Sequence, residues 1–126
     1  MCGAFGITVD GGRVTSARLA FGGMAAVVRR AVQAEAALSG APWSQASGDA
    51  AKAALALDFQ PLTDLRASNG YRMQVAQNLL QRFWLETRDD DPLPPQATSV
   101  WARAAHPAHP AHPMHPDASG MPAGRA

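Results

Sequence analysis

The chain has 126 residues and a mass of 13.2 kDa, which is enough for one small domain at most. Eleven Lys and Arg against ten Asp and Glu give a net charge of +1, so neither nucleic acid nor an anionic membrane is indicated as a partner. No stretch approaches the roughly 20 apolar residues that cross a bilayer. The first 20 residues also lack the apolar core of a signal peptide, and we therefore expect a cytoplasmic protein.

Proline content divides the chain near residue 88. Eight of the ten prolines follow Arg88, in a segment with few bulky apolar residues. Proline removes a backbone donor and disrupts both helices and ladder strands. We therefore predict a folded domain over residues 1–88 and an extended or disordered tail over residues 89–126. Fewer than ~90 residues can build only a small core.

The first 21 residues predict an antiparallel hairpin. Phe5, Ile7 and Val9 alternate with small or polar residues, which is the pattern of a half-buried strand. Asp10-Gly11-Gly12 follows as a turn, and an alternating run continues from Val14 to Phe21. Because two strands alone are marginal in water, the hairpin needs a further strand or helices on its apolar face.

One cysteine, Cys2, lies on the first predicted strand. A single cysteine forms no intramolecular disulfide and no cysteine-rich metal site. With no neighbouring His or Arg to ionise it, we interpret Cys2 as a small buried apolar residue in preference to a nucleophile.

The first predicted helix covers about residues 27–39. Its apolar residues recur at helical spacing, and Gly40 is a suitable C-terminal stop. Arg29 and Arg30 would then lie in the first turn, where the helix dipole disfavours cations. Either a nearby anion compensates them or they are simply solvated. The shared face consists of Val27, Ala31, Ala34 and Leu38.

Two further helices are predicted. Ser47 is a candidate cap for a helix that ends before Pro61, with Ala50, Ala53, Ala54 and Leu57 facing inward. Ser68 is the candidate cap of a third helix that ends near Thr87 and carries a strong apolar stripe. The stripe consists of Ala76, Leu79, Leu80 and Phe83, flanked by Tyr71, Val75 and Trp84. The fold class is therefore α+β, with an antiparallel hairpin or sheet packed on three helices and a disordered Pro/His-rich tail.

The loop before the third helix carries a candidate staple. Asp64 can accept hydrogen bonds from nearby backbone amides, and Arg72 lies one turn into the helix, within reach of Asp64. We interpret this pair as structural, with a role in subunit assembly as the alternative.

Five short strings of the sequence resemble the C-terminal domain of the FAD-binding subunit of molybdenum hydroxylases, most closely the small subunit of bacterial xanthine dehydrogenase. The resemblance covers about residues 2–101 and implies an antiparallel sheet packed on three helices. The strings are Cys2-Gly3-Ala4-Phe5, Phe21-Gly22-Gly23-Met24-Ala25-Ala26, the segment from Asp58 to Ser68, Tyr71-Arg72, and Asn78-Leu79-Leu80-Gln81-Arg82-Phe83.

The resemblance also implies partners. In the family this domain follows a larger FAD-binding region, an iron-sulfur domain often precedes that region, and a separate molybdopterin subunit oxidises the purine. The family's first strand, before the Cys-Gly-Ala-Phe string, has no counterpart here, so we expect that Met1 begins inside the domain. The chain then resembles a truncated remnant, a fragmentary gene model or one piece of a split subunit.

For cofactor contact, the resemblance points to Leu19, which occupies the place of an apolar residue that touches FAD in the family. The alternative is that Leu19 is a core residue of its strand. Gly22 and Gly23 have no Cβ, so they allow positive φ and the close approach of a backbone or a flat ligand. A basic residue that approaches FAD in some relatives has no equivalent around Ala36 and Ala37.

The tail carries histidines at every third residue. In a polyproline II helix these imidazoles would project along one edge about 9 Å apart, too far for neighbours to share a metal unless the chain bends. We therefore predict no metal site, with a metal-binding tail as the alternative. The histidines are His106, His109, His112 and His115.

Three functions remain open. The first is a fragment of the FAD subunit of a xanthine-dehydrogenase-like enzyme, which in the intact assembly passes electrons from purine oxidation through FAD to NAD. The second is a small non-catalytic interaction module that docks through the hairpin edge, and the third is a metal-binding protein. No catalytic residue is assigned, and whether the chain is an enzyme is left open. We expect that the chain alone does not retain FAD.

Overall fold

The computed structural model describes residues 1–99 and divides the chain into two units. The first unit, Met1–Pro94, holds the sheet and the three long helices. The second unit begins at Pro95, where the described residues form one short helix, α4 (Pro95–Thr98). This helix differs from the expectation of an extended or disordered tail over residues 89–126, of which residues 100–126 lie outside the described part of the chain. Pro95 opens the helix, the position at which its missing N–H costs nothing.

The sheet has the strand order β1-β2-β3 and is antiparallel throughout. β1 (Cys2–Asp10) pairs with β2 (Arg13–Gly22), with Phe5 opposite Leu19. Gly11 and Gly12 both have positive φ, 58° and 78°, as the tight turn of a two-residue hairpin requires. β3 is only Arg29–Arg30 and continues the sheet beside the end of β2. The predicted hairpin is confirmed, together with a third strand that the sequence did not reveal.

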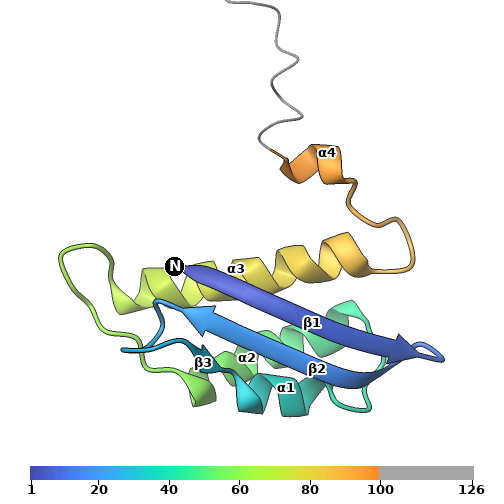
Figure 1. The fold of residues 1–126 in the computed structure, drawn as a ribbon, viewed down its shortest axis with the longest axis horizontal. Coiled ribbons are helices and arrows are strands. Elements are labelled where there is room, and N and C mark those ends of the chain that lie inside the picture. The colour runs from blue at the N-terminus through green and yellow to red at the C-terminus, as the bar shows by residue number, and fades with distance from the viewer. Residues whose placement is uncertain (100–126) are drawn as a thin grey trace, which may run out of the picture. The chain divides into compact units, whose positions relative to one another are not determined.

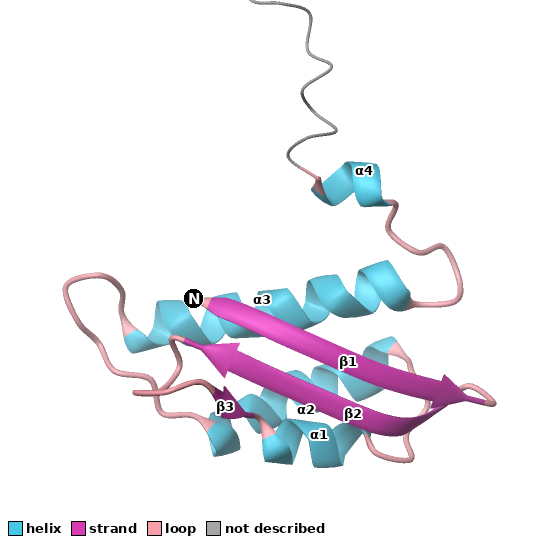
Figure 2. Cartoon of the chain, viewed as in Figure 1, coloured by secondary structure: helices cyan, strands magenta, loops and turns pink. Residues whose placement is uncertain are grey.

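Three helices cover one face of the sheet (Figures 1 and 2). α1 (Val32–Leu38) contacts β2, α3 (Asn69–Thr87) contacts β1, and α2 (Gln45–Asp58) packs against both other helices. Between the layers lies a core of fully buried side chains. Its largest members are Val14, Leu19, Phe21, Met24, Leu38, Leu55 and Leu80. The α+β architecture predicted from the sequence is therefore confirmed.

Aromatic rings link the sheet to the helices. The Phe5 ring lies 5.2 Å from Phe21 and 5.4 Å from Phe83, and Phe21 lies edge-on to Phe59 at 5.7 Å. Such tilted pairs stabilise a core beyond the area that they bury. Phe83 was predicted on the apolar stripe of the third helix, and it contacts the sheet as expected.

The first helix begins later than predicted. Residues 27–31 are not helical: Val27 and Val28 are exposed in the loop after β2, and Arg29 and Arg30 form β3. The sequence expectation was wrong because Val27 continues the helical spacing of Ala31, Ala34 and Leu38 by coincidence. The two arginines therefore do not oppose a helix dipole. Gly40, with φ of 74°, follows the end of α1 as predicted.

The cap and inner face of α2 also differ from the prediction. Ser44 is the N-cap, and Ser47 is the third helical residue and completes a capping box with it. The inner face consists of Gly48, Ala51, Leu55 and Asp58. The residues predicted to face inward, Ala50, Ala53 and Leu57, are exposed, and Ala54 is half-buried. Six of the fourteen residues of α2 are alanine, so few large side chains fix which face is apolar.

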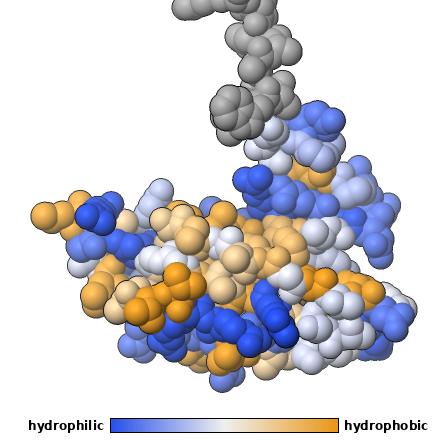
Figure 3. Space-filling model, viewed as in Figure 1, coloured by the Kyte–Doolittle hydropathy of each residue, from blue (hydrophilic) through white to orange (hydrophobic). Residues whose placement is uncertain are grey.

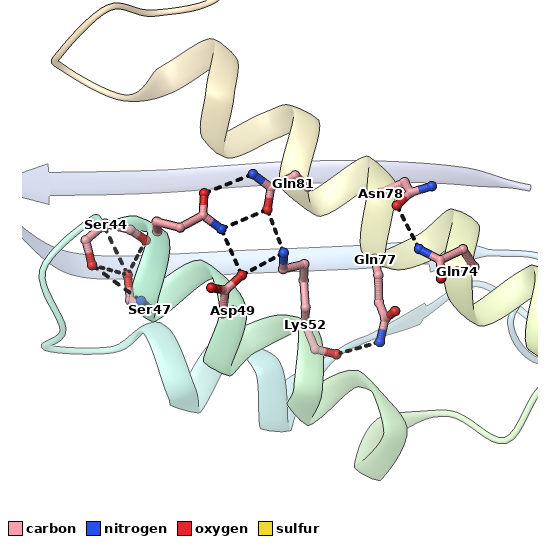
Figure 4. Close-up of polar contacts among 9 residues, drawn as sticks. Ser44, Ser47, Asp49, Lys52, Gln74, Gln77, Asn78 and Gln81 are labelled. Atoms are coloured by element: carbon pink, nitrogen blue, oxygen red, sulfur yellow. Dashed lines mark hydrogen bonds and ion pairs between the residues drawn. The ribbon is translucent and has the colours of Figure 1, made fainter.

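Polar side chains line the seam between α2 and α3 (Figure 4). Lys52 Nζ lies 2.6 Å from Gln81 Oε1 and 2.7 Å from Asp49 Oδ1, and Gln45 exchanges hydrogen bonds with Gln81. One turn earlier in α3, Gln77 donates to the backbone carbonyl of Lys52 at 3.3 Å. These bonds fix the two helices against each other at the surface.

Candidate functional site

A pocket of about 530 Å³ lies at one end of the domain. It is bounded by the loop after β2, by the end of α2 with the segment that follows, and by the first turn of α3. We call this part of the molecule the pocket end. The lining residues include Gly23, Met24, Arg29, Phe59, Asp64 and Arg72.

Arg72 holds two walls of the pocket together. Its guanidinium donates to the carbonyl of Gly23 at 3.0 Å and to both oxygens of Asp64 at 3.0 Å. The staple between Asp64 and Arg72 predicted from the sequence is therefore confirmed. The additional bond to Gly23, 49 residues away, joins the loop after β2 to α3, and no local pattern could have revealed it.

Asp64 is set up to remain ionised. Its Oδ1 accepts the backbone amides of Arg66 and Ala67 at 2.8 and 3.1 Å. These two hydrogen bonds, followed by that from the Arg72 guanidinium, hold the pKa of the carboxyl below its ordinary value. Because an aspartate so bonded has its acceptor sites occupied, its role is to shape the loop.

The other carboxylate of the pocket, Asp58, also accepts hydrogen bonds on both of its oxygens. Its two oxygens accept the amides of Gln33 and Ala34 at 2.9 and 3.0 Å, which are donors at the start of α1. Asp58 therefore caps one helix from the last residue of another.

Arg29 is the cation of the pocket without a carboxylate partner among residues 1–99. Its guanidinium lies over the ring of Phe59, 5.8 Å from the centroid. Arg72 also has a buried Nε without a hydrogen-bond partner in the described part of the chain. The pocket thus combines apolar walls with two guanidinium groups that retain donor capacity.

The residues predicted to contact FAD lie near this end of the sheet but are largely engaged. Leu19 is fully buried, its N–H donates to Glu35 Oε1 at 2.8 Å, and its carbonyl accepts from Ala31. Gly22 is buried, and a Cβ there would come within 2.8 Å of Cys2 Sγ. As the chain stands, Leu19 and Gly22 therefore offer a flavin no accessible edge, and their contact with FAD stays a prediction.

Gly23 lines the pocket and has the special backbone that the sequence suggested. Its φ is 88°, and a Cβ there would lie 3.2 Å from Met1 Cα, so glycine permits both the turn and the close approach of the N-terminus. For Gly22 the expectation of positive φ is wrong, because it continues β2. Cys2 is exposed instead of buried, since it begins the edge strand.

Metal binding and membrane insertion were also considered for the chain. The tail histidines His106, His109, His112 and His115 lie outside the described residues. Within residues 1–99, no cluster of three or more His, Cys, Asp or Glu is arranged to hold a metal ion. In the same part of the chain, no helix is long and apolar enough to cross a membrane.

Comparison with known proteins identifies the family. A three-stranded antiparallel sheet covered on one face by three helices defines the class as a small α+β domain. Residues 1–87 match the model of the CO dehydrogenase flavoprotein C-terminal domain, and the chain belongs to this family of molybdenum hydroxylase flavoprotein domains. No curated protein matches it.

Solved structures agree with this assignment. Carbon monoxide dehydrogenase from Hydrogenophaga pseudoflava is 31% identical, with a TM-score of 0.59 over 64% of this chain and 28% of that one. CO dehydrogenase from Oligotropha carboxidovorans is 28% identical, with a TM-score of 0.58 over the same shares. Quinoline 2-oxidoreductase from Pseudomonas putida 86, at 24% identity, shares the fold, with a TM-score of 0.61 over 72% of this chain and 32% of that one. The chain thus spans about a third or less of these structures.

Proposed function

We propose that the chain serves as the C-terminal domain of the FAD-binding part of a molybdenum hydroxylase of the xanthine dehydrogenase type. In the intact assembly this part passes electrons from purine oxidation through FAD to NAD. Its partners are the remaining FAD-binding and iron-sulfur regions and a molybdopterin subunit. The chain itself supplies structure and one side of the flavin surroundings, and we assign it no catalytic residue.

One observation carries the proposal. The match to the flavoprotein domain covers residues 1–87, which include the complete sheet and all three long helices. Within that match, the sequence of Phe21-Gly22-Gly23-Met24 forms the end of β2 and the wall of the pocket. The xanthine and NAD specificity rests on the resemblance of the short sequence strings alone. The similar structures are named for oxidation of carbon monoxide and quinoline.

The test is anaerobic reduction of the complex that contains the chain. A tagged full chain is purified from its native cells together with the polypeptides that bind it, and flavin absorbance is followed after addition of xanthine, quinoline or carbon monoxide. We expect FAD in the complex and flavin bleaching by xanthine, reversed by NAD. Bleaching by another substrate alone would contradict the xanthine assignment, and a complex without flavin would contradict the function.

A second function is favoured by one feature of the sheet. β1 is an edge strand, and it has neither a charged residue nor a proline between Cys2 and Val9. An uncharged edge of this length is a template for pairing with another strand. The chain could therefore act as an interaction module that docks through β1. Replacing Gly6 by lysine would place a charge on this edge strand and oppose such pairing, and a Cβ at this position meets no atom within 4 Å. Retention of the flavin partner by this variant would argue for the first function.

A further inference from the structure

Exposed apolar side chains gather at the pocket end. Nine large hydrophobic residues are exposed in the described part of the chain, and six of them belong to segments that border the pocket. Leu62 is 82% and Leu65 107% exposed, which is as exposed as a side chain becomes. Figure 3 shows orange residues at the left end of the domain, where the loop after α2 lies in Figure 1. The six are Val27, Val28, Leu57, Leu62, Leu65 and Tyr71. Clustered exposed apolar residues indicate a covered surface.

Charge at this surface favours an acidic partner group. Both oxygens of each pocket carboxylate, Asp58 and Asp64, accept hydrogen bonds from backbone amides or from Arg72. Arg29 has no carboxylate partner among residues 1–99 and is more than one-third exposed. A carboxylate brought against Arg29 would therefore neutralise the cation that the domain itself leaves uncompensated.

The N-terminus lies at the same end. Met1 packs against Gly23, a residue that lines the pocket, and Figure 1 shows the start of β1 beside the end of β2. The family is named as the C-terminal domain of a flavoprotein, so in a full-length flavoprotein the remaining part precedes such a domain. A preceding region would thus approach this domain beside the pocket end, next to the exposed apolar residues.

These three observations identify one surface and one occupant. We propose that the pocket end is the docking surface for the preceding region of the flavoprotein, and that an acidic side chain of that region enters the pocket to bind Arg29. The apolar residues around the pocket supply the buried contact area. This inference rests on the proposed function, because the occupant is the flavoprotein's own remaining part.

The test measures binding between the full chain and the part of the Hydrogenophaga pseudoflava CO dehydrogenase chain that the match leaves uncovered. We expect the wild-type chain to bind, and Leu62→Asp and Leu65→Asp to weaken binding at least tenfold. Because both leucines are exposed, neither variant removes a core contact. Ala46→Asp is the matched control. It adds the same charge to an exposed position in the first turn of α2, about 16 Å along the helix from the pocket.

Arg29 is tested by the salt dependence of the same binding. Arg29→Ala should weaken binding severalfold and flatten its dependence on salt, and Arg29→Lys should restore most of that dependence. Equal binding by the wild type and both leucine variants would overturn the assignment of the pocket end as the docking surface and leave the proposed function standing. A loss of binding in Ala46→Asp equal to that in the leucine variants would overturn the same assignment. A wild-type chain that does not bind would overturn the proposed docking, whereas the proposed function is decided by the flavin content of the complex purified from the native cells.

Discussion

The Glu35 carboxylate accepts a backbone hydrogen bond from β2 that a longer third strand would otherwise accept. Its Oε1 accepts the amide of Leu19 in β2 at 2.8 Å and Nε of Arg30 at 2.9 Å. Its Oε2 accepts the Arg30 Nη2 at 2.7 Å, so the pair is bidentate. The Glu35 residue is 9% exposed, and the hydrogen-bond partners of its carboxylate offset the cost of burying it.

We predict that Glu35→Gln makes stability less dependent on pH. Burial alone raises the pKa of the Glu35 carboxyl, but the hydrogen bonds from Arg30 and the Leu19 amide outweigh it and hold the pKa below its ordinary value. The unfolded state then binds more protons between the two pKa values, so wild-type stability falls as pH falls through them.

Urea unfolding at neutral pH and near pH 3 would measure this dependence. The difference between wild type and Glu35→Gln should be largest at neutral pH and should shrink in acid. Glu86→Gln, which breaks the surface pair with Arg82, serves as the control and should change stability little. A constant difference across the pH range would show that Glu35 contributes through shape and not through charge.

We predict that Leu80→Ala lowers the free energy of unfolding by about 2 to 5 kcal/mol. The side chain is 1% exposed and lies on the inner face of α3. Leu65→Ala, at a fully exposed leucine, should change stability by less than about 0.5 kcal/mol. Similar losses from both substitutions would contradict the core described for this domain.

Leu19→Ala should be as costly as Leu80→Ala, because Leu19 is fully buried. The sequence left two roles open for this residue, a strand core position or a flavin contact. Its burial agrees with the first role. The flavin contact is tested separately, by the FAD affinity of an intact subunit that carries Leu19→Ala.

At the scale of elements, the inner face of a helix could be predicted where large apolar side chains mark it. The third helix was predicted with the correct cap, Ser68, and the correct end, Thr87. Its bulky stripe leaves little choice of face. In α2, six of the fourteen residues are alanine, so few large side chains mark the inner face, and the predicted face was one residue away from the true one. In α1, the expected helix ran through β3, because a two-residue strand has no periodicity to detect.

Capping is the element-scale feature most open to test. The Ser44 side chain accepts the amide of Ser47 at 3.3 Å, and Ser47 Oγ accepts the amide of Ser44 at 3.0 Å. We predict that Ser44→Ala lowers the free energy of unfolding by about 1 kcal/mol, the typical value of an N-cap. Thermal or urea melts would measure it, with the exposed strand residue Ser16 replaced by Ala as the control. An unchanged melting curve for Ser44→Ala would show that the capping box is dispensable.

At the scale of the whole molecule, the candidate site divides into local and distant parts. The staple of Asp64 and Arg72 spans eight residues and was predicted, because a loop and the helix after it keep such residues together. The contact of Arg29 with Phe59 and that of Arg72 with Gly23 join distant segments. They depend on how α2, α3 and the sheet pack, and no spacing in the sequence encodes that packing.

We expect that the full chain, purified and dialysed, retains no FAD, and that flavin absorbance and fluorescence of the protein stay at background. Leu19 has its backbone donor and acceptor engaged and Gly22 is packed against Cys2, so at most the rim at Gly23 faces a ligand. The sequence also lacks a glycine-rich phosphate cradle, without which the dinucleotide has no anchor. Adding the remainder of a family flavoprotein, loaded with FAD, is the matched comparison, and the flavin should then stay with the complex. A stoichiometric flavin on the dialysed chain alone would contradict this prediction and would mean that the pocket end binds the cofactor without a partner polypeptide.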